Sequence, residues 1–356
     1  MRLSTSFLTL AAAGMMACGG GEGTVRLNGA GATFPYLIYQ KWIIDYNQAQ
    51  DGVELNYQSV GSGAGVRQFA DRTVDFGASD SPMTDDELAA IGDQALHIPS
   101  VLGAVVPTYN VESISASLRF SADALAGIFL GQITRWNDPR IASDNPSVTL
   151  PSTDITVVHR SDGSGTTFIW TDYLTKTSAD WARDVGAGRS VNWPAGLGAR
   201  GNEGVTATVL QTPGSIGYVE LGYALLNNLP VARVQNRSGN FVEPSIASVT
   251  AAAAGAMLTM GPETDFRVSI TDSDGAEAFP ISSFTWLLLR TEYDDEARAR
   301  ALIEFVWWAV NEGRDDAEAL GYAPLPTELT GWIADRLTSI TVNGSSVWSG
   351  PQTTSD

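Results

Sequence analysis

GAGATFP at residues 29–35 and RSDGSGTT at residues 160–167 are two glycine-rich stretches that decide the fold. Each leads from an expected strand into an expected helix. The first residues of a helix have free backbone N–H groups, and the helix dipole adds partial positive charge there. Small residues let a tetrahedral oxyanion approach this main chain. Both stretches therefore predict anion binding at a helix N-terminus.

Strands and helices alternate outward from the first stretch. The expected elements are strands at 25–27, 53–59 and 74–79 and helices that begin near Thr33 and Ser62. The third strand runs into a turn that presents Asp80, and Thr84 with Glu87 has the spacing of a capping box for the next helix. This alternation indicates an α/β fold.

Two apolar runs of strand length, 101–107 and 281–289, flank a long middle portion with its own strands and helices. We interpret them as strands that cross between two lobes. Lobe I would then comprise residues 25–100 and 280–356, and lobe II residues 101–279, with the ligand in the cleft between them. The chain exceeds the roughly 250 to 300 residues at which single cores stop growing, which also favours two lobes.

The N-terminus has the pattern of an export signal. Residues 1–17 combine Arg2, an apolar run and small residues, as signal peptides do. The segment MMAC that ends at Cys18 resembles a lipobox, although Met15 departs from the usual leucine and leaves ordinary cleavage as an alternative. We expect a lipid anchor at Cys18, a tether at residues 18–24, and a location in the periplasm or on the outer face of the cytoplasmic membrane.

The charge balance excludes some partners and permits others. A net charge of −19 argues against nucleic acid and against an anionic membrane surface, because both require a basic footprint. It does not exclude a small anion, since the Debye length at physiological salt is only about 8 Å and local donors decide the outcome in a buried site. Two isolated histidines and one cysteine offer no metal cluster, and no cofactor is expected.

The order of the motifs resembles that of phosphate-binding proteins, the substrate-binding components of bacterial phosphate ABC transporters. The motifs are GAGATFP (29–35), YQSVGSGAGV (57–66), VDFGASDSPM (74–83), IFLGQITRWNDP (128–139), RSDGSGTTF (160–168), GNEGV (201–205) and GSIGYVELGYA (214–224). The resemblance implies a two-lobed periplasmic-binding-protein fold of type II with the ligand in its cleft. It further implies high-affinity binding of inorganic phosphate, delivery to an ABC permease with its ATPase, and no catalytic residue. Residues 235–275 match this family least.

The resemblance also implies a ligand set, taken over position by position. Phosphate would be bound by the backbone N–H groups of Thr33, Phe34 and Gly165 and by the side chains of Ser62, Asp80, Arg160, Ser164 and Thr166. Asp162 would orient the arginine and partly balance its charge. His159 stands where some relatives have a second arginine.

Asp80 is the predicted selectivity element of this set. A carboxylate can only accept hydrogen bonds, so it requires a ligand oxygen that keeps a proton, as in mono- and dibasic phosphate. Sulfate has no such proton, and sites built around a ligand donor reject analogues that lack it by about 10⁴ or more. The alternative is that Asp80 only ends a strand or caps a helix. For Arg160 the alternative is a surface salt bridge with Asp162, and Ser62 and Ser164 could both be N-caps.

Two other functions remain open at this stage. A phosphatase-like hydrolase would use Ser164 or Ser62 as nucleophile and His159 or His97 as base, but neither serine lies in a GxSxG elbow and His97 has the position of an ordinary strand-end residue. A carrier for another oxyanion would differ only in ligand, and the sequence does not separate arsenate from phosphate. In the binding-protein interpretation, hinge residues are expected at 100–107 and 278–284.

Overall fold

The computed structural model describes residues 23–92, 94–114, 116–258 and 260–351. The predicted signal peptide, the lipidation site Cys18 and most of the tether lie outside the described residues. Within the described ranges, no helix combines the length and the apolar character needed to cross a membrane.

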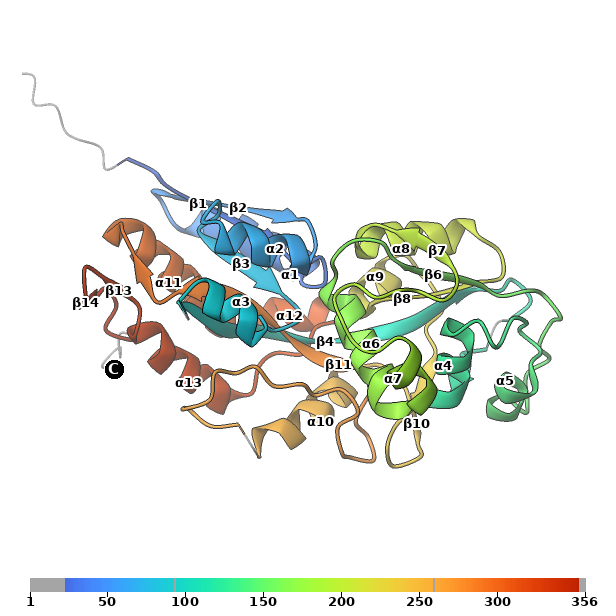
Figure 1. Cartoon of the computed structure of the whole chain (residues 1–356). Helices are drawn as coiled ribbons and strands as arrows, with labels where there is room; N and C mark the ends of the chain where they lie inside the picture. Colours follow the sequence, from blue (N-terminus) through green and yellow to red (C-terminus); the bar gives the residue numbers. More distant parts are fainter. Residues whose placement is uncertain (1–22, 93, 115, 259, 352–356) are drawn as a thin grey trace, which may run out of the picture.

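A sheet of eight strands runs through the molecule (Figure 1), in the order β2-β1-β3-β11-β4-β8-β6-β7. Its strands are β1 (Val25–Gly31), β2 (Val53–Ser59), β3 (Phe76–Ser79), β4 (Ala95–Asn110), β6 (Thr156–Arg160), β7 (Leu197–Ala199), β8 (Ser215–Glu220) and β11 (Ser282–Arg290). β1 pairs in parallel with β2 and β3, and β6 pairs in parallel with β7 and β8, whereas β4 and β11 run antiparallel to their neighbours.

The 16-residue strand β4 belongs to both lobes. Residues Ala95 to Ala104 pair with β11, and residues Val105 to Asn110 pair with β8. In Figure 1 it runs from one body of the molecule into the other. The expectation that the apolar runs at 101–107 and 281–289 are strands is therefore confirmed, and the two strands lie side by side.

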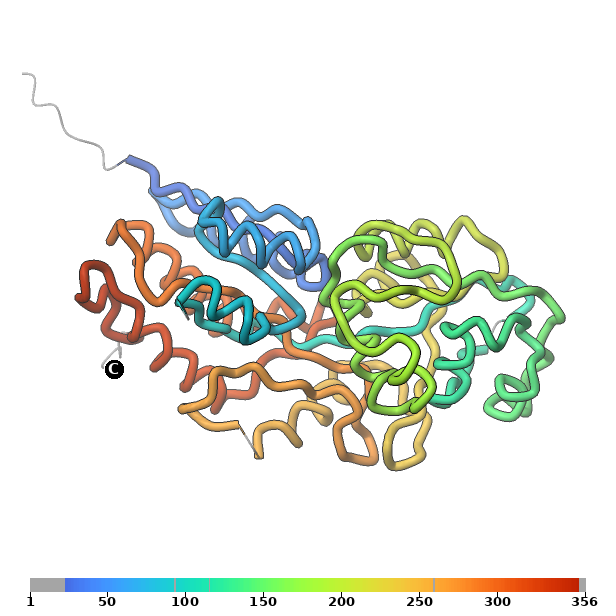
Figure 2. Tube along the Cα trace, in the orientation of Figure 1, coloured from blue at the N-terminus to red at the C-terminus, as the bar shows by residue number. Residues whose placement is uncertain are grey.

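The two bodies take their chain from different parts of the sequence, as the colours of Figure 2 show. Lobe I, which contains β1 to β3, is built from both ends of the described chain, and lobe II, which contains β6 to β8, is built from the middle. The helices of lobe I are α1 (Tyr36–Ala49), α2 (Ser62–Ala70), α3 (Asp85–Ala90), α11 (Glu296–Asn311), α12 (Asp315–Ala319) and α13 (Thr327–Thr338). Those of lobe II are α4 (Ala122–Phe129), α5 (Pro139–Asp144), α6 (Gly165–Thr177), α7 (Ala179–Asp184), α8 (Gly201–Gln211) and α9 (Leu221–Leu226).

Smaller elements complete the fold. One short sheet contains β5 (Arg119–Phe120), β9 (Arg233–Gln235) and β10 (Phe241–Val242). A second short sheet contains β12 (Glu292–Tyr293), β13 (Thr341–Val342) and β14 (Ser345–Ser346). The alanine-rich run at 251–257 lies in a helix. This helix, α10 (Ile246–Met257), packs Ala252 and its other buried small side chains against β4 and β11.

Local signals in the sequence are largely confirmed, with one correction at the first helix. β2 has the expected bounds, and both hydrogen bonds of the Thr84–Glu87 capping box are present. β1 continues to Gly31, however, and α1 begins at Tyr36 with Pro35 as its N-cap, so the helix begins about three residues after the expected Thr33. The residues between them form a tight turn, in which the Tyr36 N–H donates to the Thr33 carbonyl at 3.3 Å.

Candidate anion-binding site

The segments predicted to bind an anion meet between the lobes. Lobe I supplies the Thr33–Phe34 turn after β1, Ser62 at the start of α2 and Asp80 after β3. Lobe II supplies Arg160 at the end of β6 and the start of α6. Six of the predicted ligand residues are almost inaccessible to water, at 3% exposure or less: Thr33, whose backbone N–H was the predicted ligand, and Ser62, Asp80, Arg160, Ser164 and Thr166, whose side chains were. The sites at the carboxyl ends of strands in open α/β sheets have this arrangement.

Arg160 is a buried charge held in one orientation. Its side chain is only 1% exposed. The guanidinium donates to Asp162 through Nε at 2.8 Å and through Nη2 at 2.6 Å, while Nη1 donates to the hydroxyls of Thr33 at 3.2 Å and Thr166 at 3.4 Å. Burial lowers the pKa of Arg160, but Asp162 more than compensates, so the pKa is raised overall. The alternative of a surface salt bridge is wrong, and Nη1 is directed into the site.

Asp80 is the carboxyl group of the site. Its Oδ1 accepts from the Thr285 hydroxyl at 2.8 Å and its Oδ2 from the Ser62 hydroxyl at 3.3 Å. Burial raises the pKa of Asp80 to about 7, although Thr285, the charge of Arg160 and Ser62 all oppose the rise. The alternative that Asp80 caps the next helix is wrong, since Thr84 caps α3. Near neutral pH Asp80 is thus poised between accepting and donating a hydrogen bond.

The two serines have different roles. Ser164 is the N-cap of α6, because its hydroxyl accepts from the Thr167 N–H at 3.0 Å, and its own N–H donates to the Arg189 carbonyl at 2.8 Å. Ser62 is not a cap. It is the first residue of α2, and its hydroxyl accepts from the Asp80 N–H at 3.2 Å.

A further helix N-terminus, that of α8, faces the site and was not predicted from the sequence. The first two N–H groups of α8 point into the site: that of Gly201 donates to Asp162 Oδ1 at 3.1 Å, and that of Asn202 to Thr33 Oγ1 at 3.3 Å. The Asn202 side chain contacts both Thr33 and Thr166. The motif GNEGV, which contains Gly201 and Asn202, was one of the motifs that carry the family resemblance and was the only sequence feature that pointed to this helix. A local sequence pattern does not reveal that Asn202 contacts Thr33, 169 positions away.

Tyrosines support the Thr33–Phe34 turn from behind. The Tyr223 hydroxyl donates to the Thr33 carbonyl at 2.7 Å, and the Tyr322 hydroxyl to the Phe34 carbonyl at 2.6 Å. With both carbonyls held, the backbone N–H groups of this turn keep their direction. Neither N–H has a partner among the described residues.

The histidines do not form a catalytic pair with the serines. His97 lies within β4, not at its end, and its Nε2 accepts from the Met83 N–H at 3.0 Å; burial lowers its pKa to about 4. The His159 ring stacks on Trp193 with 4.7 Å between centroids. Among the described residues no hydrogen bond joins either histidine to Ser62 or Ser164, and no group of three or more His, Cys, Asp or Glu could hold a metal ion.

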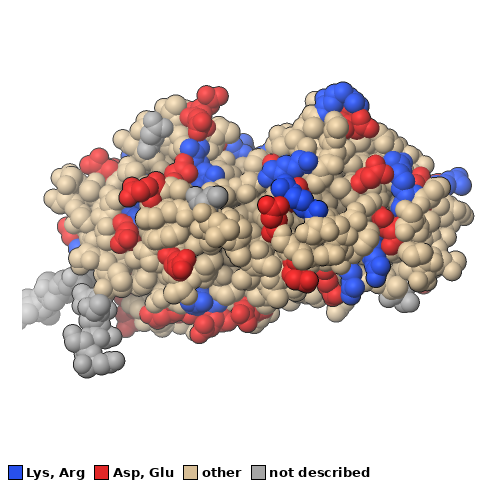
Figure 3. Space-filling model, turned by 90° about the horizontal axis from the view of Figure 1, so that it is seen from below, with Lys and Arg blue, Asp and Glu red and all other residues tan. Residues whose placement is uncertain are grey.

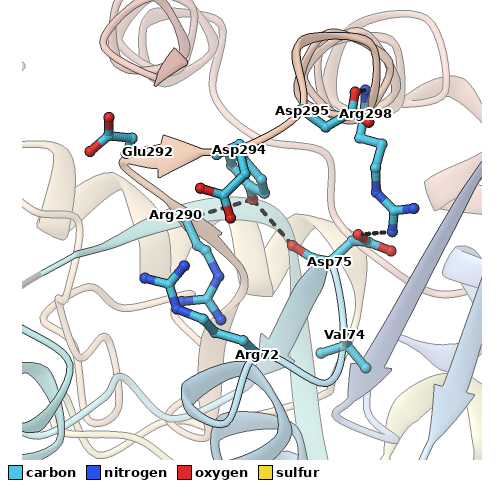
Figure 4. A pocket seen from close by; sticks show the side chains of 9 residues that line it. Arg72, Val74, Asp75, Arg290, Glu292, Asp294, Asp295 and Arg298 are labelled. Atoms are coloured by element: carbon cyan, nitrogen blue, oxygen red, sulfur yellow. Dashed lines mark hydrogen bonds and ion pairs between the residues drawn. The ribbon is translucent and has the colours of Figure 1, made fainter. Parts of the chain in front are cut away.

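A hollow of about 210 Å³ lies on lobe I away from this site (Figure 4). Figure 4 shows Arg72 and Arg290 side by side, with Arg298 directed at Asp75. Its lining contains three arginines and four carboxylates: Arg72, Arg290, Arg298, Asp75, Glu292, Asp294 and Asp295. These charges nearly cancel, so we do not count the hollow as an anion site.

Comparison with known proteins identifies the family. A family model described as a PBP superfamily domain matches residues 19–312. The phosphate-binding protein PstS of Xylella fastidiosa strain 9a5c is 45% identical over 307 residues, which cover 86% of this chain and 83% of the relative. PstS of Pasteurella multocida is 46% identical over 304 residues, which cover 85% of this chain and 87% of the relative. The chain belongs to the PstS family of phosphate-binding proteins.

Solved structures agree with this PstS family membership. A high-affinity periplasmic phosphate-binding protein bound with phosphate is 26% identical and superposes with a TM-score of 0.71, covering 90% of this chain and 96% of the other. A phosphate-binding protein from Stenotrophomonas maltophilia is 21% identical and has the same fold, with a TM-score of 0.68. The superposition covers 88% of this chain and 94% of the other. The expected two-lobed periplasmic-binding-protein fold is confirmed.

The raised pKa of Asp80 makes a prediction about stability. Asp80→Asn should stabilise the free protein relative to wild type, by an amount that grows as the pH rises from the ordinary pKa of 3.8 to about 7 and is constant above that. In this range folded wild type holds a proton that the unfolded chain has released, so its stability falls as the pH rises, whereas asparagine has no such proton. Urea unfolding of both proteins across this range measures the difference. A difference that does not change with pH would contradict the prediction.

Proposed function

We propose that this PstS-family protein binds inorganic phosphate outside the cytoplasmic membrane and delivers it to an ABC permease and its ATPase, without doing chemistry on it. The observation that carries the proposal is the buried site, where one fixed guanidinium and several free N–H and O–H donors face a single carboxyl group. The proposed ligands are the eight residues named from the resemblance: Thr33, Phe34, Ser62, Asp80, Arg160, Ser164, Gly165 and Thr166.

The charge distribution is compatible with an anionic ligand. On the face shown in Figure 3, acidic and basic side chains are interspersed over both lobes, and no broad basic patch is present. The negative net charge therefore acts mainly at the surface, where salt screens it. Inside the site, Arg160 and the helix N-termini act at contact distance in a medium of lower dielectric.

Asp80 and phosphate can share one proton in two equivalent ways. Ionised Asp80 accepts from monobasic phosphate, and protonated Asp80 donates to dibasic phosphate, with the same total number of protons in the complex. A pKa of about 7 for Asp80 makes both forms accessible near neutral pH. Sulfate can use only the second form, since it has no proton to donate.

We further propose that the lobes close on phosphate about β4. The pairing of β4 changes from β11 to β8 between Ala104 and Val105, which falls inside the hinge expected at 100–107. The arrangement described is a closed one: the Gly63 N–H donates across the cleft to the Gly163 carbonyl at 2.9 Å, and a Cβ on Gly63 would lie 3.1 Å from Gly163 Cα.

An ion pair at the rim also joins the lobes. Arg189 donates through Nη2 to both carboxylate oxygens of Glu87 in α3. Partial burial raises the pKa of Glu87, but the hydrogen bonds from Arg189 and Thr84 and the charge of Arg189 together lower the pKa overall. Because the Arg189 carbonyl also holds the N–H of Ser164, the pair connects α3 of lobe I to the anion-binding turn of lobe II.

We also propose that Cys18 carries a lipid anchor, that lobe I comprises residues 25–100 and 280–356, and that lobe II comprises residues 101–279. A lipid on Cys18 and a tether of a few residues would keep lobe I near the membrane that holds the permease. The site itself does not depend on the anchor, so protein lacking residues 1–22 is the material for the experiments below.

Calorimetry with phosphate and sulfate tests the proposed function. We expect phosphate to bind, and sulfate to bind about 10⁴-fold more weakly above neutral pH, because ionised Asp80 then faces an oxygen without a proton. Sulfate affinity should rise as the pH falls below about 7. Asp80→Asn should weaken phosphate binding and remove the pH dependence for sulfate, because its amide always donates. If wild type shows no heat of binding with either phosphate or sulfate, phosphate binding is refuted.

Gly165→Ala tests closure. A Cβ at this position would lie 2.5 Å from Ser62 Oγ and 2.6 Å from Asp80 Cβ, so the two lobes could not approach fully. We expect phosphate affinity to fall about tenfold or more, with little loss of thermal stability, since overpacking affects only the closed state. Gly204→Ala in α8 is the control, because its Cβ meets ordinary contacts of 3.6 Å and more. Unchanged phosphate affinity in Gly165→Ala would contradict the closure model.

Arg189→Met tests the ion pair at the rim. Removing the bond to Glu87 should speed phosphate release about three- to tenfold while association changes little, because only the closed state contains this contact. Stopped-flow measurement of release gives the rate. Arg183→Met, which removes the same charge from exposed ion pairs within α7, is the matched control. Equal release rates for both variants would refute a role of the pair in closure.

A further inference from the structure

Asn202 is a buried amide at the centre of the site to which the resemblance assigned no role. It is the second residue of α8 and is 0% exposed. Its Nδ2 donates to Thr33 Oγ1 at 2.7 Å and to Thr166 Oγ1 at 3.1 Å, so one amide group reaches a threonine of each lobe.

The amide has only one consistent orientation. Asn202 Oδ1 accepts from the Glu220 backbone N–H at 3.0 Å. If the amide were flipped, NH₂ would face this N–H donor, and two donors cannot bond to each other. The backbone of β8 therefore fixes which end of Asn202 faces the threonines, and that end can only donate.

This fixed donor determines how the two hydroxyls behave. A hydroxyl has two acceptor positions and one proton. Thr33 Oγ1 faces three donors, and the two nearer ones, Asn202 Nδ2 at 2.7 Å and Arg160 Nη1 at 3.2 Å, fill its acceptor positions, while the Asn202 N–H lies farther away at 3.3 Å. Thr166 Oγ1 accepts from Asn202 Nδ2 and Arg160 Nη1. Neither hydroxyl donates to any other part of the described chain. Their protons are left for a ligand.

We propose that Asn202 is a positioning residue that fixes the Thr33 and Thr166 hydroxyls as donors to bound phosphate. The inference rests on the proposed function, since it concerns the same site. It explains why the site holds its ligand without competition from its own polar groups: each acceptor position of the two hydroxyls is occupied by the protein.

The inference extends to selectivity. An unoriented hydroxyl could accept a ligand proton as readily as donate its own, and the proton of phosphate could then lie on either threonine. With both hydroxyls fixed as donors, the ligand oxygens that face them must be unprotonated. The protonated oxygen is thereby directed to Asp80, and the selectivity of that carboxyl group depends on Asn202.

A mutant cycle with phosphate calorimetry tests the proposal. Asn202→Ala should weaken phosphate binding about tenfold in wild type but by less than about threefold in a background that carries both Thr33→Val and Thr166→Val, because both hydroxyls through which Asn202 acts are absent there. Titration to millimolar phosphate covers the weakened variants. Equal losses in both backgrounds would show that Asn202 acts only through the general structure, and this outcome would overturn the proposal.

Asn202→Asp provides an independent readout. Its carboxylate would accept from both threonine hydroxyls and turn their protons away from the ligand, so phosphate affinity should fall about 100-fold or more. Asn56→Asp makes the same charge change at an exposed position of β2 and should bind phosphate like wild type. If Asn202→Asp does not fold, as thermal unfolding would show, the alanine cycle decides the matter. Binding of phosphate by wild type separately establishes the proposed function, so failure of the inference and failure of the function are distinguished.

Discussion

The whole binding site depends on keeping the charge of Arg160 in a place that water does not reach. A buried guanidinium costs several kcal/mol in desolvation unless close partners compensate. Asp162 supplies that compensation through two parallel bonds from the same turn, and the N-terminus of α8 in turn satisfies Asp162. Together with the contacts to Thr33 and Thr166, these bonds leave one Nη2 hydrogen of the guanidinium without a partner among the described residues. Binding of an anion beside this guanidinium adds opposite charge where the protein has already borne the cost of burial.

Around that charge, hydrogen bonds within the protein hold the polar groups in fixed orientations. Thr285 and Ser62 hold Asp80, the carbonyls of the Thr33–Phe34 turn accept from tyrosines, and the Asn202 amide faces the threonines. Such a site needs little rearrangement when it binds, so less of the interaction energy is spent on ordering side chains. The remaining freedom lies in the approach of the two lobes, where glycines at the contact allow backbone to meet backbone.

The sequence predicted the parts of this structure that depend on neighbours along the chain. The alternation of strands and helices, the bounds of β2 and the capping box at Thr84 follow from local spacing. The start of α1 and the position of His97 within β4 were wrong by a few residues, because strand pairing and the Thr33 turn override local propensity. The contact of Asn202 with Thr33 and the Arg189–Glu87 pair were missed, since each joins residues more than 100 positions apart. Only the family resemblance indicated which distant turns share a site.

The continuity of β4 has a consequence for the independence of the lobes. One half of β4 pairs with β11 of lobe I and the other half pairs with β8 of lobe II. At this crossing there is therefore no exposed linker at which the chain could be divided. Lobe I contains both ends of the described chain and completes its sheet only with β11, which follows lobe II in the sequence. During synthesis, the sheet that contains β1, β2 and β3 is therefore complete only after β11 (Ser282–Arg290) has been made. A chimaera that exchanges one lobe between relatives would have to cut inside β4, so these lobes are expected to vary together.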